Sequence, residues 1–318
     1  MITVENAILD IQNVSVRFAN GSAVQAVEQV SLSVFPSDKL CIIGETGSGK
    51  SILLLSVLRL LPASAVVSGD VCFHGQSLFA LSPKQMDGVR GGQISYVPQG
   101  SGNGMNPLLS VGFQVGEPLI AHRGMNKKRA IARAVELMRR FHLGREEELA
   151  RQYPYTLSGG MRQRAVLAIA LASRAKILLV DEPTTALDVT IQAQILDLLR
   201  RLQQKLHTAT ILVSHDLGVV ARAADRVAVM YAGKIVEIGT AEEVYYDPRH
   251  PYTWALLRSL PALSEAGGAL YTIPGMPPTL IDPPPGDAFA CRNPQALAID
   301  YQQQPPMFPV SDTHYAAT

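Results

Sequence analysis

Cysteine is scarce in this chain, and neither sign of charge is in excess. The three thiols, Cys41, Cys72 and Cys291, are far apart, so they cannot form a disulfide framework or a four-thiolate zinc site. This cysteine usage fits a reducing compartment such as the cytosol. Twenty-eight basic residues face 27 acidic ones, a formal net charge of +1. Because nucleic-acid binding usually needs a strongly basic face, we expect no nucleic-acid partner.

Long apolar runs are also missing. The most apolar stretch, residues 52–62, contains Arg59 and is shorter than the roughly 20 residues that a membrane-spanning helix needs. The first ten residues show no basic stretch followed by an apolar one, so we expect no signal peptide. Hydrophobic residues still make up 47% of the 318 residues, which is enough for a sizeable core. The sequence therefore predicts a globular protein that does not cross a membrane.

The pattern of short apolar runs and amphipathic segments predicts an α/β fold. Alternating residues over 8–18 and 30–35 indicate an antiparallel sheet near the N-terminus. Buried strands are predicted over 39–43, 177–180 and 210–213, helices over 51–61, 126–142, 161–173 and 190–206, and a hairpin over 227–238. Proline becomes dense after about residue 248, which excludes long helices and central strands there. We therefore expect a main domain, residues 1–248, and a C-terminal extension, residues 249–318.

A glycine-rich segment lies between a predicted strand and a predicted helix. It reads Gly44-Glu45-Thr46-Gly47-Ser48-Gly49-Lys50-Ser51 and matches the pattern G-x-x-x-x-G-K-[ST]. The backbone N–H groups of such a loop and of the following helix can surround phosphate groups. Lys50 would reach the β- and γ-phosphates, and Ser51 would bind Mg²⁺. The alternative is an accidental glycine-rich turn, which the flanking strand and helix disfavour.

An acidic pair, Asp181 and Glu182, follows the apolar run of residues 177–180. In phosphate-loop NTPases, an Asp at such a strand end lies on the Mg²⁺ side of the site. Glu182 is then placed to orient or deprotonate an attacking water molecule. Taken alone, the pair is as readily a solvated strand end, and the phosphate loop is what favours the metal interpretation.

A Ser-Gly-Gly step, Ser158-Gly159-Gly160, opens the helix predicted over 161–173. A helix N-terminus of this kind can bind an anion, so the chain has two candidate phosphate-binding helix starts. This suggests that each nucleotide is held between two copies of such a domain. A helix cap followed by flexible glycines is the alternative.

In order and spacing, these segments resemble the ATP-binding subunit of ABC transporters over roughly residues 7–262. Residues 157–161, LSGGM, resemble the signature motif of that family, and Gln163 follows closely. Gln99 lies where the Q-loop glutamine is expected. Three more residues match by position, namely Asp188 in a D-loop-like segment, His215 in a switch-histidine segment, and Phe18 at the aromatic that stacks on adenine.

The resemblance implies an ABC-type, RecA-like phosphate-loop core, with an N-terminal antiparallel β subdomain and a helical subdomain near residues 100–172. It implies that the chain binds ATP and hydrolyses it. Two such chains would close head to tail, so that each ATP contacts the phosphate loop of one chain and Ser158-Gly159-Gly160 of the other.

Roles for single residues also follow from the resemblance. Mg²⁺ would be bound by Ser51, Gln99 and Asp181. Glu182 would be the general base, and His215 would contact the γ-phosphate and link its state to closure. Gln99 would also transmit that state to a membrane permease.

Five segments resemble the dipeptide, oligopeptide and nickel importers more narrowly: residues 153–154, 184–194, 215–221, 250–253 and 273–278. This resemblance implies a second, related ATPase subunit, two transmembrane permease subunits and an extracytoplasmic substrate-binding protein as partners. It implies a peripheral position on the cytoplasmic face of a bacterial-type inner membrane. Peptides are the expected cargo, nickel or a metal chelate is the alternative, and a soluble ABC ATPase of DNA repair or translation is a more distant one.

The extension departs from that subfamily in its cysteines. Many members carry a cysteine group resembling a four-thiolate cluster site, whereas Asp287, Asn293 and Asp300 stand at three of the matching positions here. Only Cys291 remains, and iron–sulfur clusters are normally held by four thiolates. We therefore expect no iron–sulfur cluster. Phe289, Leu297, Ile299, Tyr301 and Phe308 are apolar enough to pack the extension against the core or a partner ATPase.

Overall fold

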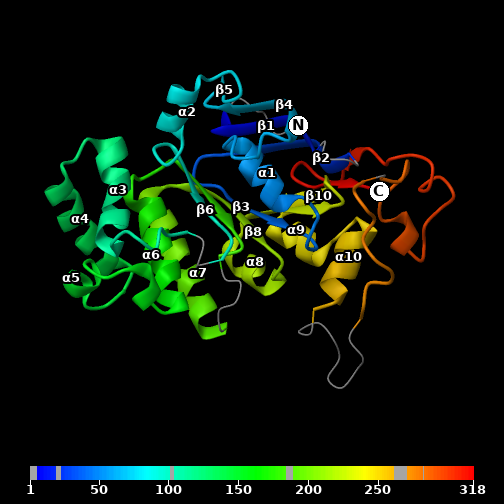
Figure 1. The fold of residues 1–318 in the computed structure, drawn as a ribbon. Coiled ribbons are helices and arrows are strands. Elements are labelled where there is room, and N and C mark those ends of the chain that lie inside the picture. Colours follow the sequence, from blue (N-terminus) through cyan, green and yellow to red (C-terminus); the bar gives the residue numbers. More distant parts are fainter. Residues whose placement is uncertain (1–5, 19–22, 101–103, 184–188, 261–270, 282) are drawn as a thin grey trace. The chain divides into compact units, whose positions relative to one another are not determined.

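The computed structural model describes residues 6–18, 23–100, 104–183, 189–260, 271–281 and 283–318 (Figure 1). The chain divides into two compact units. The first comprises Met1–Phe35, Lys39–Ala80 and Val213–Thr318, and the second comprises Pro36–Asp38 and Leu81–Leu212. The boundary expected at residue 248 stays a prediction. Among the helices that the structure describes, none is both long and apolar enough to cross a membrane.

The first unit begins with a four-stranded antiparallel sheet in the order β2-β1-β4-β5. Its strands are β1 (Leu9–Phe18), β2 (Val24–Val34), β4 (Ala65–Phe73) and β5 (Gln76–Ser77). Leu9 of β1 pairs with Val34 on one side and with Phe73 on the other. This confirms the antiparallel N-terminal sheet, although β2 begins several residues earlier than the alternation predicts.

The other strands of the first unit follow the order β11-β12-β10-β9-β3. They are β3 (Lys39–Ile43), β9 (Arg226–Tyr231), β10 (Lys234–Thr240), β11 (Met307–Pro309) and β12 (Tyr315–Ala317). β3 and β9 are parallel, and Ala232 and Gly233 turn the chain between β9 and β10 with φ angles of 46° and 84°. Two positive φ values in a two-residue turn are typical of a tight hairpin, so the predicted hairpin is confirmed.

The helices of the first unit are α1 (Lys50–Val57), α8 (Leu217–Ala223), α9 (Ala241–Tyr246), α10 (Pro251–Arg258) and the 3₁₀ turn η4 (Ala290–Arg292). The apolar run predicts that α1 continues to residue 61, and this is wrong. The helix closes with a Schellman motif, in which the Leu60 N–H donates to the Leu55 carbonyl and Arg59 has a φ of 52°. Apolar composition does not reveal such a stop, because the run continues past it.

The second unit contains the helices α2 (Pro83–Val89), α3 (Val111–Arg123), α4 (Lys127–Arg140), α5 (Glu146–Leu149), η2 (Pro154–Thr156), α6 (Gly159–Ala172) and α7 (Val189–Leu206). Its strands are β6 (Ile94–Val97), β7 (Ile177–Asp181) and the first four residues of β8 (Ala209–Ser214), whose last two residues are assigned to the first unit. β6 and β7 are parallel, and all five residues of β7 are buried. Apolar residues on both faces are what a parallel strand requires, so the run 177–180 is a core strand as predicted.

Helices α3, α4 and α6 pack together within the second unit, where Figure 1 shows them side by side. Leu119, Ala130 and Ala172 form a buried cluster among them. Gly116 of α3 lies so close to α4 that an added Cβ would be 3.0 Å from the Ala130 carbonyl oxygen. The small residue therefore allows the two helices to approach.

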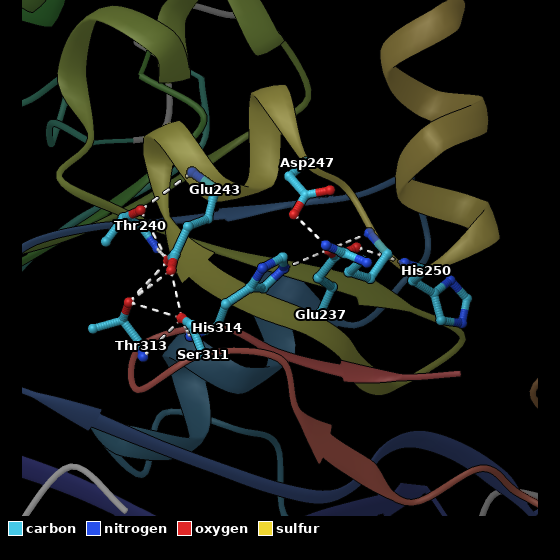
Figure 2. Close-up of polar contacts among 9 residues, drawn as sticks. Glu237, Thr240, Glu243, Asp247, His250, Ser311, Thr313 and His314 are labelled. Atoms are coloured by element: carbon cyan, nitrogen blue, oxygen red, sulfur yellow. Dashed lines mark hydrogen bonds and ion pairs between the residues drawn. The ribbon is translucent and has the colours of Figure 1, made fainter.

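The last residues of the chain are attached to β10 and α9 by polar contacts (Figure 2). Ser311 Oγ and Thr313 Oγ1 donate to Glu243 Oε1 at 2.6 and 2.8 Å. Burial alone would raise the pKa of Glu243, but the hydrogen bonds from Ser311, Thr240 and Thr313 lower it to about 2. His314 Nε2 lies 2.7 Å from Glu237 Oε1, and both side chains are buried.

The five apolar side chains expected to pack the extension differ in how far they are exposed. Phe289 is 1% exposed and packs within the first unit, whereas Leu297 is 66%, Ile299 53%, Tyr301 48% and Phe308 50% exposed. Packing of the extension on its own chain therefore relies on Phe289, on the buried residues Tyr252, Ala255 and Leu257 of α10, and on the polar contacts above. A partner for the other four side chains stays a prediction.

Candidate nucleotide-binding site

The glycine-rich loop lies between β3 and α1 in the first unit, as predicted. Gly44, Gly47 and Gly49 have φ angles of 151°, 85° and 102°. A Cβ on Gly44 would lie 2.0 Å from the Met230 carbonyl oxygen, and one on Gly49 would lie 2.4 Å from that of Ala26. Both positions therefore need glycine for close approach as well as for backbone conformation. Thr46 and Gly47 are exposed at the tip.

Lys50 begins α1, and its side chain folds back over the loop. Its Nζ donates to the carbonyl oxygens of Gly44 and Glu45 at 2.8 and 2.7 Å, and to Ser48 Oγ at 3.2 Å. The residue is only 4% exposed, while the next residue, Ser51, is partly exposed. The ammonium group thus lies within the loop whose backbone can surround phosphates.

Two more predicted residues belong to the first unit. Phe18 is the last residue of β1 and is partly exposed, as a residue that stacks on a flat ligand needs to be. His215 follows β8 and is exposed. The residues around His215 stabilise the turn that follows β8. Asp216 Oδ1 accepts from the Gly218 N–H at 2.8 Å, and Ser214 Oγ accepts from the Asp216 N–H at 3.0 Å.

In the second unit, Asp181 ends β7 and is 2% exposed. Tyr96 OH donates to Asp181 Oδ2 at 3.2 Å. Burial raises the pKa of Tyr96, and the Asp181 carboxylate raises it further, so the phenol stays protonated and can donate. Sequence reasoning missed this tyrosine, because its nearness to Asp181 depends on the pairing of β6 with β7, which no local pattern indicates.

Glu182 and Gln99 are brought together by the two parallel strands of the second unit. Gln99 Nε2 donates to Glu182 Oε2 at 2.8 Å. Glu182 has a φ of 43°, which is uncommon for a residue with a Cβ. Such backbone conformations cost energy and concentrate at functional sites. The contact therefore places the Gln99 amide beside the carboxylate that directly follows Asp181, where activation of the attacking water is predicted.

Ser158 caps α6, and its Oγ accepts from the Met161 N–H at 3.3 Å. Ser158 is exposed and Gly159 and Gly160 are partly exposed, so this helix start faces solvent within its unit. Gln163 is 1% exposed, and its Nε2 has no hydrogen-bond partner among the described residues. Asp188 lies outside the described residues.

A buried Lys in a glycine loop before a helix, and a buried Asp followed by Glu after a parallel strand, are the defining parts of a phosphate-loop ATPase. Residues 27–185 match the family model described as ABC transporter, and residues 236–299 match the one described as oligopeptide/dipeptide transporter, C-terminal region. The chain belongs to the ABC transporter family and is an ATPase of its ATP-binding cassette type. The predicted ABC-type α/β fold is thereby confirmed.

Relatives match along nearly the whole chain. An "Oligopeptide transport ATP-binding protein OppD" of Bacillus subtilis is 49% identical over 97% of this chain and 87% of its own. A "Dipeptide transport ATP-binding protein DppD" of Lactococcus lactis is 46% identical over 99% of this chain and 91% of its own. Among solved structures, a dimeric ATP-binding cassette "bound to ADP and Pi" has a TM-score of 0.66 at 29% identity, covering 73% of this chain and 98% of that one.

Proposed function

We propose that this chain hydrolyses ATP to power the import of dipeptides or oligopeptides through a separate membrane channel. The match of residues 236–299 to the oligopeptide/dipeptide transporter C-terminal region carries this proposal. The matched region lies C-terminal to the residues that match the ABC transporter model, so its match distinguishes peptide importers from ATPases that match the ABC transporter model alone. Relatives named for oligopeptide and dipeptide transport, which include the extension in their matched length, support the same cargo.

We propose that the phosphate loop and the strand-end acids act on one ATP with Mg²⁺. The residues fit these groups, because the loop tip at Thr46 and Gly47 is exposed, an added Cβ on Gly47 would meet no atom within 4 Å, and Ser51, Gln99 and Asp181 supply the oxygen donors that Mg²⁺ prefers. When bound, Mg²⁺ neutralises charge on the phosphates.

Within that site, side chains of this chain hold the nucleotide, and one of them accepts a proton. Lys50 Nζ binds phosphate oxygens, and Phe18 stacks on the adenine. A carboxylate oxygen of Glu182 takes the proton of the attacking water, and Gln99 orients that carboxylate. His215 contacts the γ-phosphate and reports its presence.

We propose that the working unit contains a second, related but non-identical ATPase chain. The exposed start of α6 supports a second ATPase chain, identical or not, because Ser158 and its two glycines can then contact the nucleotide of that chain. That the second chain is non-identical rests on the resemblance to the dipeptide, oligopeptide and nickel importers. Two permease subunits and an extracytoplasmic binding protein complete the importer. The chain sits on the cytoplasmic face of the membrane through the permeases.

The test is ATPase activity with and without these partners. We expect low activity from the purified chain alone, and a large, substrate-dependent increase with the second ATPase, the permeases and the binding protein. Co-purification from detergent-solubilised membranes is expected to recover the permeases. Full, substrate-coupled activity from this chain alone would contradict the proposed pairing, and recovery of nucleic acid instead of permeases would contradict the transport role.

We also propose that the extension holds no iron–sulfur cluster. The residues at the cysteine-like positions already have other bonds, since Asp287 Oδ1 accepts from the Phe289 N–H at 3.0 Å and Asp300 Oδ2 accepts from the Leu297 N–H at 2.7 Å. Anaerobically purified protein is expected to be colourless, with substoichiometric iron. Visible-range cluster absorbance with stoichiometric iron would prove this wrong.

A further inference from the structure

An arginine of the extension contacts the phosphate loop directly. Arg292, the last residue of η4, binds Glu45 with both arms of its guanidinium group: Nη1 lies 2.6 Å from Oε2 and Nη2 lies 3.0 Å from Oε1. The Arg292 side chain is 5% exposed and the Glu45 side chain 25%. A bidentate, largely buried ion pair of this kind fixes the relative orientation of the two side chains and also stabilises their contact.

The position of Arg292 is set by groups other than Glu45. Its Nε donates to the Pro274 carbonyl at 2.8 Å, and its Nη1 also donates to Tyr231 OH at 3.2 Å. The guanidinium carbon lies 5.8 Å from the centre of the Tyr231 ring and 5.9 Å from that of Phe289. Because both rings are 1% exposed, the cation is held by the packed interior of the first unit.

A second residue beyond position 248 holds the backbone of Glu45. The Glu45 N–H donates to Tyr252 OH at 2.8 Å. Tyr252 of α10 is fully buried, with its ring 4.4 Å from that of Tyr231 and 5.4 Å from that of Phe289. Burial raises the pKa of Tyr252, so its hydroxyl is protonated at any physiological pH.

The same residue, Glu45, also contacts the phosphate-binding lysine. Its carbonyl oxygen accepts from Lys50 Nζ at 2.7 Å. Glu45 therefore joins Arg292 through its side chain, Tyr252 through its N–H and Lys50 through its carbonyl group.

We infer that the C-terminal extension is a positioning element of the phosphate loop, with Arg292 as the residue that orders Glu45 and, through it, Lys50. A loop that is already ordered loses less conformational freedom when a nucleotide binds, so affinity is higher. The inference rests on the proposed role of Lys50 in nucleotide binding. Its specific consequence is that loss of the contact weakens ATP affinity while the hydrolysis of bound ATP changes little.

Four variants test this: Arg292→Ala, Arg292→Lys, Glu45→Ala and the double variant Glu45→Ala/Arg292→Ala. The matched control is Arg258→Ala, which removes an exposed arginine of the extension that stacks on Trp254, 4.0 Å from the ring centre. ATP affinity is measured by titration of each variant, and KM and kcat are measured in the assembled complex. Thermal unfolding reports on the fold, and Arg292→Lys keeps the charge if Arg292→Ala fails to fold.

We expect Arg292→Ala to raise the Kd and KM for ATP about tenfold, the range for losing a charged hydrogen-bond pair, with kcat within about twofold. The Kd and KM of Arg292→Lys are expected to lie between those of the wild type and of Arg292→Ala, because an ammonium group keeps the charge but cannot make the bidentate contact. The double variant is expected to be no worse than Glu45→Ala. Affinities equal to the Arg258→Ala control, or fully additive losses in the double variant, would overturn the inference. If instead Lys50→Ala leaves ATP binding intact, the proposed role of the loop fails.

Discussion

Replacing Glu182 with Gln is expected to leave ATP binding intact and to reduce turnover by about 10²–10⁴-fold, the range for losing a general base. The amide has the shape of the carboxylate but cannot accept the proton of the attacking water. The geometry favours this residue, because Glu182 directly follows the buried Asp181 and accepts a hydrogen bond from Gln99 at 2.8 Å. Steady-state phosphate release and a separate nucleotide titration measure the two quantities.

Glu242→Gln is the matched control for Glu182→Gln. Glu242 is an exposed carboxylate in the first turn of α9, outside the predicted site. We expect the control variant to keep wild-type turnover. Hydrolysis by Glu182→Gln at the wild-type rate would remove Glu182 from the mechanism.

Replacing Lys50 with Ala is expected to act at the binding step instead. The change removes the ammonium group that lies within the loop and leaves the Gly44 and Glu45 carbonyls without the donor that now joins them. It also removes the positive charge available to phosphate oxygens. We expect ATP affinity to fall about 10²-fold, the upper range for hydrogen bonds that involve a charged group, as measured by nucleotide titration.

Lys39→Ala is the control for Lys50→Ala. Lys39 begins the strand that leads into the loop, and its Nζ pairs with Asp225 at 3.1 Å. A partly exposed ion pair contributes about 0–1 kcal/mol, so this variant is expected to stay folded and to bind ATP normally. Equal affinities for wild type and Lys50→Ala would contradict the predicted binding role.

The local parts of the site could be predicted from the sequence because their signals are local. The glycine pattern, the apolar run before Asp181 and the Ser-Gly-Gly step each occupy one short segment. The structure places each at a strand end or helix start, as expected. The backbone requirement at Gly44 and Gly49 explains why the pattern itself is recognisable.

The contacts of the extension could not be predicted, because they join distant parts of the chain. Arg292 and Glu45 are 247 positions apart, and nothing in either segment indicates the other. The pairing of β12 with β10 rests on strands too short to show alternation. Apolar composition also does not show whether a side chain packs on its own chain or on a partner, since Leu297 and Ile299 are exposed in this chain whereas His314 and Glu237 are buried as a pair.

Uptake of a labelled oligopeptide into proteoliposomes tests the central claim most directly. The vesicles would contain the permeases and the second ATPase, with this chain present as wild type or as Glu182→Gln, and with the substrate-binding protein supplied. We predict ATP-dependent peptide accumulation with the wild-type chain and none with the variant, while a nickel chelate neither accumulates nor competes. Peptide accumulation that is equal with both chains, or transport of the nickel chelate and of no peptide, would contradict the account.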